Sequence, residues 1–223
     1  MGRKIVGVDI DGVLNRYGRH FCQELKRKSG KEIEYSKISR IPITDCPNVD
    51  VNIEDVLLVF NDPEFWQRVP PDEFAAEGLR ELFEKNYSII IFTYRPWPHL
   101  DVSNDLQVKK TIDEWQKYGF ALSKPKDAIR DITKDWLEES KMVFDTLFVM
   151  TDRNMIETDR FEYCKLNSVD VFVEDDMSNA KRLAEFVTTV IVVDRPWNRD
   201  GRGNMPENVV FTSGWTEIVS RGN

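Results

Sequence analysis

Residues 5–14 read IVGVDIDGVL, in which the apolar run 5–8 leads into two aspartates separated by one residue. Short apolar runs rich in β-branched residues are typical of strands buried on both faces of a parallel sheet. In an open α/β sheet, ligands bind at the carboxyl ends of the strands, which is where Asp9 and Asp11 would lie. Side chains alternate along an extended chain, so these two carboxylates share one side, and Gly12 allows a tight turn after them.

The pair of aspartates indicates a particular chemistry. Two carboxylates so close together resist joint ionisation unless a cation lies near them. Mg²⁺ prefers a few carboxylates together with water and phosphate oxygens. One carboxylate could attack phosphorus, while the other protonates the leaving oxygen and later activates water. An isolated Asp-x-Asp is commonly a turn, but the apolar strand before Asp9 and the Gly-Val-Leu after Asp11 favour a functional site.

Further apolar runs along the chain alternate with helical patterns. We expect strands at residues 88–93, 147–151, 170–174, 189–193 and 209–212. Helical spacing of apolar residues predicts helices over 72–85, with Asn86 ending the helix, over 105–118, and around 129–137. Thr158 and Ser178 are expected to cap two more. Strands that alternate with helices predict an α/β fold with a Rossmann-like parallel sheet.

Residues 15–71 do not follow this alternation. They include a charged, helix-prone piece at 21–29 and an irregular run with Pro42 and Pro47. We interpret them as a small helical cap inserted after the first strand, with residues 1–14 and 72–223 forming the catalytic core.

Composition limits the function classes. The net charge of −8 argues against a nucleic-acid polymer as partner, whereas a small phosphorylated ligand responds to local charge. The three cysteines show no metal-binding or paired spacing, and no long apolar stretch is present. These features predict a cytoplasmic protein that does not associate with membranes, of unspecified oligomeric state.

The stretch Asp9-Ile10-Asp11-Gly12-Val13 resembles motif I of the haloacid dehalogenase (HAD) superfamily of phosphatases. The resemblance implies the HAD fold and hydrolysis of phosphomonoesters through an aspartyl-phosphate intermediate. It makes Asp9 the nucleophile and Asp11 the general acid and base. It also implies Mg²⁺ as cofactor, held by Asp9, by the backbone carbonyl of Asp11 and by a later acidic residue.

Two further motifs of that pattern occur in order. The strand at 88–93 ends in Thr93, whose hydroxyl could donate to a phosphoryl oxygen. Tyr94 and Arg95 follow in a turn similar to a T-x-R-P turn of related proteins, so we expect both beside the substrate. The strand at 170–174 runs into Glu174-Asp175-Asp176, where we expect Asp175 to bind the metal, with Glu174 as the alternative.

The basic residue of the pattern is ambiguous in this chain. The family usually has a lysine at the start of the helix before the last acidic motif. Arg160 satisfies the expected position, because it follows the predicted cap at Thr158, whereas Lys165 satisfies the residue type. Arg153 is a third option. This departure leaves the identity of the residue open and is compatible with a weakly active protein.

The substrate is suggested by residues 65–71, which resemble the return from the cap in 5′(3′)-deoxyribonucleotidase-like proteins. The resemblance implies a nucleoside monophosphate. Four aromatic residues of the insertion could stack on a base or form the core of the cap: Tyr17, Phe21, Phe65 and Trp66. The alternatives are a sugar-phosphate phosphatase and a catalytically quiet HAD-fold protein that binds a phosphate ligand. The segment 194–198 is expected to border the site in an unassigned role.

Overall fold

The protein is described by a computed structural model, which places residues 2–95, 125–150 and 153–221. These residues form a six-stranded sheet in which each neighbouring pair of strands is parallel. The order is β3-β2-β1-β4-β5-β6. The strands are β1 (Lys4–Asp9), β2 (Tyr87–Tyr94), β3 (Thr146–Met150), β4 (Val171–Glu174), β5 (Thr189–Val193) and β6 (Val209–Thr212). The predicted α/β class and parallel sheet are therefore confirmed.

The first strand lies near the middle of the sheet, between β2 and β4. Gly7 permits this close packing, because a Cβ at that position would lie 2.4 Å from the ring of Phe172 on β4. The chain places β2 and then β3 on one side of β1, and it places β4, β5 and β6 on the other side. The direction in which strands are added to the sheet therefore switches between β1 and β4. In α/β sheets a ligand crevice forms at such a point, outside the carboxyl ends of the strands.

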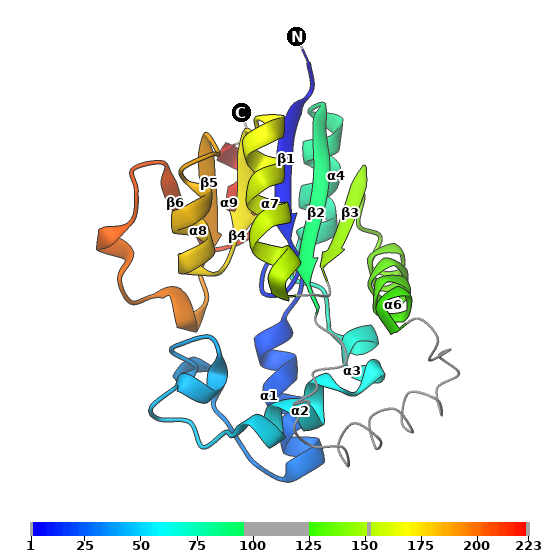
Figure 1. Ribbon diagram of the computed structural model, residues 1–223, viewed down its shortest axis with the longest axis vertical. Helices are drawn as coiled ribbons and strands as arrows, with labels where there is room; N and C mark the ends of the chain where they lie inside the picture. The colour runs from blue at the N-terminus through cyan, green and yellow to red at the C-terminus, as the bar shows by residue number, and fades with distance from the viewer. Residues whose placement is uncertain (1, 96–124, 151–152, 222–223) are drawn as a thin grey trace.

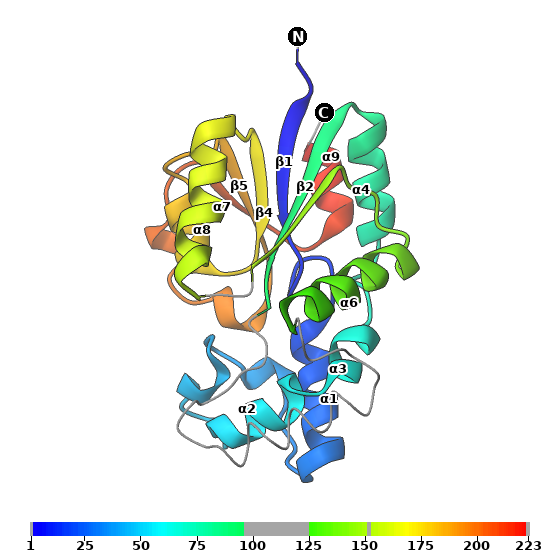
Figure 2. The same cartoon turned by 45° about the vertical axis from the view of Figure 1, so that its right-hand side comes forward.

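Helices cover both faces of the sheet (Figures 1 and 2). The helices α4 (Ala75–Glu84) and α9 (Trp215–Arg221) pack on one face, and α7 (Arg153–Asn167) and α8 (Met177–Leu183) on the other. The helix α6 (Pro125–Glu139) lies beside β3. Short 3₁₀ turns, η3 (Pro196–Asn198) and η4 (Arg202–Asn204), follow β5. Asn86, with φ of 66°, follows the end of α4 as predicted.

Residues 15–71, which we call the lower lobe, lie across the carboxyl ends of the strands (Figure 1). They contain α1 (Tyr17–Ser29), η1 (Tyr35–Lys37), η2 (Ile43–Asp45), α2 (Ile53–Phe60) and α3 (Pro63–Arg68). The chain leaves and returns at adjacent points, because Asn15 pairs with Pro71 and the amide of Asp72 donates to the carbonyl of Leu14. The division into a core and a cap as separate units stays a prediction.

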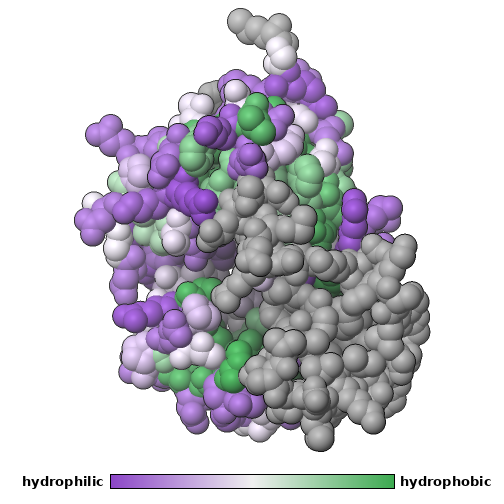
Figure 3. Space-filling model, in the orientation of Figure 1, coloured by the Kyte–Doolittle hydropathy of each residue, from purple (hydrophilic) through white to green (hydrophobic). Residues whose placement is uncertain are grey.

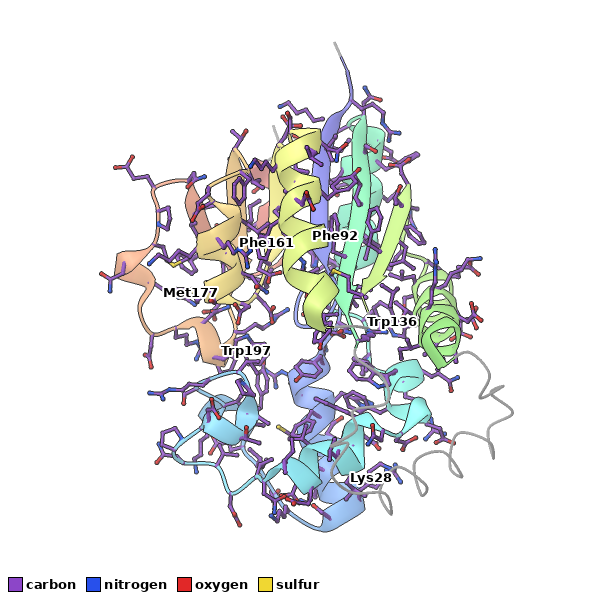
Figure 4. The ribbon with its side chains drawn as sticks, in the orientation of Figure 1. Lys28, Phe92, Trp136, Phe161, Met177 and Trp197 are labelled. Atoms are coloured by element: carbon purple, nitrogen blue, oxygen red, sulfur yellow. The ribbon has the colours of Figure 1, made fainter. Side chains whose placement is uncertain are left out.

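The lower lobe has its own hydrophobic core, built from α1, α2, α3 and the segments that connect them. Three residues of α6 (Ala128, Ile129 and Ile132) and Trp197 also belong to this core. The lobe is thus fastened to the sheet at two places. Figure 4 shows Trp197 at the junction of the two parts.

Two predicted helix starts are wrong. The helix α7 begins at Arg153, five residues before Thr158, and α8 is capped by Asp176 rather than Ser178. The Asp176 side chain accepts a hydrogen bond from the amide of Asn179. Threonine, serine and aspartate are all good N-caps, so the residue type alone does not decide which one is used. The helix predicted at 105–118 lies outside the described residues.

The surface visible in Figure 3 is mainly hydrophilic over its described part, with scattered hydrophobic areas. Three of the exposed large hydrophobic residues, Ile41, Ile53 and Leu58, belong to the lower lobe. None of the helices within the described ranges combines the length and the apolar character that a membrane span requires.

Candidate active site

Three buried carboxylates meet where β1 and β4 end. Asp9 is the last residue of β1, Glu174 is the last residue of β4, and Asp175 follows it. One oxygen from each lies within 4.8 Å of the others, and all three residues are buried. We call them the acidic cluster. The parallel pairing of β1 with β4 brings them together, because the carboxyl ends of parallel strands meet at one edge of a sheet.

Arg160 reaches the acidic cluster from α7. Its Nη2 donates to Oδ1 of Asp9 over 2.7 Å, and its Nη1 donates to Oε1 of Glu174 over 3.3 Å. Arg160 lies seven residues beyond the start of α7, about 10 Å along the helix axis. Helical side chains tilt towards the N-terminus, so the long arginine side chain bridges that distance. Lys165 is exposed in the last turn and does not join the cluster, and the side chain of Arg153 lies outside the described part.

The carboxylate of Asp11 lies beside the acidic cluster and accepts four hydrogen bonds. Its Oδ1 accepts from Nδ2 of Asn15 at 2.8 Å and from Nη2 of Arg95 at 2.9 Å. Its Oδ2 accepts from Oγ1 of Thr93 and from Nε of Arg95, both at 3.1 Å. A carboxylate offers about four acceptor positions, so these donors fill them.

Arg95 and Thr93 therefore donate hydrogen bonds to Asp11. From the sequence, we expected both residues to contact a phosphoryl group. Arg95 is 0% exposed, and its guanidinium forms a two-pronged pair with Asp11. Its Nη1 donates to Oγ1 of Thr133 on α6 at 3.1 Å. The guanidinium also lies over the ring of Trp66 on α3, with 4.8 Å to the ring centre. Arg95 thus links the lower lobe, α6 and Asp11.

The carboxylates at this edge of the sheet outnumber the guanidiniums. The buried Asp9, Glu174 and Asp175, together with the half-buried Asp11, lie against two guanidiniums, those of Arg95 and Arg160. Burial raises the pKa of Asp9 from 3.8 to about 6, against the opposing effect of Arg160. Burial, with the charge of Asp9 second, also raises the pKa of Glu174 and of Asp175 well above the usual range. A divalent cation would restore the balance.

Gly12 packs against the carboxylate of Asp175. Its φ is 87°, and a Cβ there would lie 1.9 Å from Oδ2 of Asp175. The turn after β1 therefore requires glycine for two reasons, the left-handed backbone and the close approach of a carboxylate.

The segment 194–198 connects three loops of the site through side-chain hydrogen bonds to backbone carbonyls. Asn198 is 0% exposed, and its Nδ2 donates to the backbone carbonyls of Asp175 and Val193, each at 2.8 Å. Nε of Arg195 donates to the carbonyl of Gly12 at 2.6 Å. The segment thus ties the ends of β4 and β5 to the turn after β1.

A pocket of about 220 Å³ opens beside Asp11 and Asp175. We call it the aromatic pocket, because five of its other lining residues are aromatic: Tyr17, Phe60, Trp66, Tyr94 and Trp197. Ile41 and Asp176 complete the lining. Phe21, Phe65 and Trp66 are buried in the core of the lower lobe. Of the four aromatic residues singled out from the insertion, Tyr17 and Trp66 line the pocket, and whether they stack on a base stays a prediction.

The chain was compared with protein-family models, curated proteins and solved structures. No protein-family model matches the chain. "Putative nucleotidase BH1399" of Halalkalibacterium halodurans is 29% identical over 113 residues, which are 49% of this chain and 54% of that protein. The chain thus matches about half the length of this curated relative.

Solved structures match over nearly the whole chain. The haloacid dehalogenase-like hydrolase family protein SP0104 from Streptococcus pneumoniae is 9% identical, with a TM-score of 0.56 and 99% of each chain covered. A HAD family hydrolase from Deinococcus radiodurans R1, solved with phosphate and sodium, is 13% identical, with a TM-score of 0.55 and 97% and 93% covered. The chain has the haloacid dehalogenase fold. This confirms the fold expected from Asp9-Ile10-Asp11-Gly12-Val13.

On the HAD fold, the expected site residues lie at the carboxyl end of the sheet, apart from Lys165. The sequence did not single out two buried polar residues that hold this site, Asn15 and Thr133, and it gave no role to Asn198 within the segment 194–198. Asn15 stands four residues after Asp11, so its nearness to the first motif was a usable signal. Thr133 had none, because it lies within an ordinary amphipathic helix pattern.

Proposed function

We propose that the chain is a Mg²⁺-dependent phosphomonoester hydrolase with Asp9 as its nucleophile. The observation that carries the proposal is the group of three buried carboxylates with the half-buried Asp11 beside them, which together outnumber the two guanidiniums that pair with them. Burying unbalanced charge is costly, so proteins keep such groups mainly for ligands or catalysis. The hydrolase names of the fold neighbours and the nucleotidase name of the curated relative support the same class.

The acidic cluster fits Mg²⁺ by its donor chemistry. Its three carboxylates, Asp9, Glu174 and Asp175, are the hard oxygen ligands that Mg²⁺ prefers, and they would hold the ion. When bound, the ion would offset their charge and draw negative charge from the phosphoryl oxygens. The predicted role of the Asp11 backbone carbonyl as a further ligand is part of this proposal.

In the first step, a carboxylate oxygen of Asp9 bonds to phosphorus, and the bond from phosphorus to the ester oxygen breaks. Arg160 donates to Oδ1 of Asp9, and we assign the attack to the other oxygen, Oδ2. Asp11 supplies the proton to the leaving oxygen. Asp11 lines the aromatic pocket, so a leaving group held there would lie next to it.

In the second step, Asp11 takes a proton from water, whose oxygen bonds to phosphorus as the bond to Asp9 breaks. Inorganic phosphate leaves, and both aspartates return to their first state. Arg160 keeps its positive charge throughout, because arginine does not lose its proton in proteins. It would hold Asp9 in place and offset charge on the phosphoryl oxygens.

The aromatic pocket favours a nucleoside monophosphate over a sugar phosphate. Five aromatic rings line it, and flat rings stack well on a base. Sugar phosphates and a catalytically quiet phosphate-binding protein remain the alternatives that the experiment must separate.

The test is phosphate release from a panel of nucleoside monophosphates and sugar phosphates, with Mg²⁺ or EDTA. We expect metal-dependent release by the wild type, loss of more than about 1,000-fold in Asp9→Asn, and unchanged release in Asp135→Asn. Asp135 is an exposed residue of α6 and controls for the chemical change. Equal activity in Asp9→Asn would overturn the nucleophile. Mg²⁺ binding without release from any ester would favour the quiet binding protein.

A further inference from the structure

Arg95 is a fully buried arginine whose charge is paired inside the protein. It is 0% exposed, and three of its nitrogens donate hydrogen bonds, two of them to Asp11 and one to Thr133. Removing a guanidinium from water costs several kcal/mol, which only well-aligned partners offset. This arginine is therefore packed around Asp11, and its Nε, Nη1 and Nη2 all donate to protein side chains.

The four bonds to Asp11 are not equivalent. Nitrogen donors of Arg95 and Asn15 can only donate, whereas the hydroxyl of Thr93 can donate or accept. When Asp11 carries a proton, Thr93 is therefore the partner that can reverse its bond, and it lies on Oδ2. Arg95 donates to both carboxylate oxygens and so sets the plane of the Asp11 carboxylate.

Trp66 connects this arrangement to the aromatic pocket. Its ring faces the Arg95 guanidinium and also lines the pocket. The indole nitrogen donates to the carbonyl of Phe60 at 2.9 Å, which fixes the plane of the ring. A leaving group in the pocket is thus separated from the guanidinium by one side chain.

We propose, on the basis of the proposed function, that Arg95 is a positioning residue for Asp11 and not a phosphate-binding residue. It holds the Asp11 carboxylate in the orientation that the proposed proton transfer to the leaving oxygen requires. Trp66 and Thr133 fix Arg95 in turn. The arrangement makes proton transfer, and not substrate binding, dependent on Arg95.

The test compares Arg95→Lys with wild type on two esters. One is the best alkyl phosphate from the panel, whose leaving oxygen needs a proton. The other is p-nitrophenyl phosphate, whose nitrophenolate leaves without one and whose first turnover is followed as a burst. Lysine keeps the charge but lacks the two-pronged geometry. We expect kcat for the alkyl phosphate to fall at least about tenfold, with KM, inhibition by inorganic phosphate and the burst rate unchanged.

A merely structural role would reduce both reactions equally, and a phosphate-binding role would raise KM and weaken inhibition by phosphate. Either result would overturn the inference. Thr133→Val, which keeps the shape of the side chain, should show the same pattern with a smaller loss, and it serves if Arg95→Lys does not fold. Arg3→Lys, at the opposite end of the sheet, is the matched control. A wild type without metal-dependent hydrolysis would instead overturn the proposed function, and this inference with it.

Discussion

Replacing the proposed nucleophile by asparagine should stabilise the metal-free protein. Asp9 is buried with Glu174 and Asp175, and its pKa is raised from 3.8 to about 6. Burial is the largest cause and exceeds the attraction of Arg160. The neutral amide of Asp9→Asn would leave no charge to bury at this position, and Arg160 would keep its bond to Glu174.

The size of the effect follows from the pKa. The folded protein holds the Asp9 proton more tightly than the unfolded chain does, so the free energy of unfolding falls as pH rises from 3.8 to about 6. At about 1.4 kcal/mol per pH unit, the loss reaches about 3 kcal/mol and stays at that level above pH 6. Asp9→Asn has no carboxyl group at this position to titrate, so its free energy of unfolding does not fall in this way. Its advantage should be about 3 kcal/mol at pH 7.5 and about half of that at pH 5.

The assay is urea unfolding followed by tryptophan fluorescence in EDTA at both pH values, then in Mg²⁺. Saturating Mg²⁺ at 100 times its dissociation constant would add about 2.7 kcal/mol to the wild type. The variant would gain less, because it has lost one carboxylate ligand. Mg²⁺ should therefore narrow or reverse the order of stability.

The reasoning would be refuted by a variant less stable than wild type in EDTA at pH 7.5. That result would mean that the Arg160–Asp9 attraction exceeds the cost of burial. An advantage that does not change between pH 7.5 and pH 5 would exclude titration of Asp9 as the cause. Asp135→Asn should unfold like the wild type under each condition.

Two further predictions concern the residues that shape the site. Gly12→Ala should cost roughly 1–2 kcal/mol for the left-handed backbone alone, and, because its Cβ would displace Asp175, Mg²⁺ affinity measured by calorimetry should fall as well. Asn198→Ala should lower the free energy of unfolding by about 3 kcal/mol in urea, since the buried carbonyls of Asp175 and Val193 lose their donor. Unchanged stability in Asn198→Ala would show that water replaces the amide.

Local pattern predicted the fold well, because each strand is a short apolar run and β1 ends in an acidic pair. The HAD arrangement followed from the order of motifs along the chain, which a parallel sheet converts into one edge. The helix start of α7 could not be read from Thr158, because several residues in the segment are suitable caps. That error also misplaced Arg160 in the first turn, and only its side-chain length brings it to Asp9.

The hydrogen-bond partners of Asp11 could not be predicted from the sequence, for a different reason. Arg95 and Thr93 were expected near the site, but the direction of a side chain depends on its packing partners. Trp66 comes from the lower lobe and Thr133 from α6, at sequence separations that no local pattern connects. Contacts of this kind are set by the tertiary structure.

The pairing of Asn15 with Pro71 has a consequence for how such a chain can change over generations. Both ends of the 15–71 segment leave the sheet at one point, so the segment can lengthen or shorten while the strands and the carboxylates keep their places. The entropy of closing a loop grows only slowly with its length, which makes such changes inexpensive. Selection could then alter the leaving group that the protein accepts by rewriting these residues, without rebuilding the chemistry at Asp9.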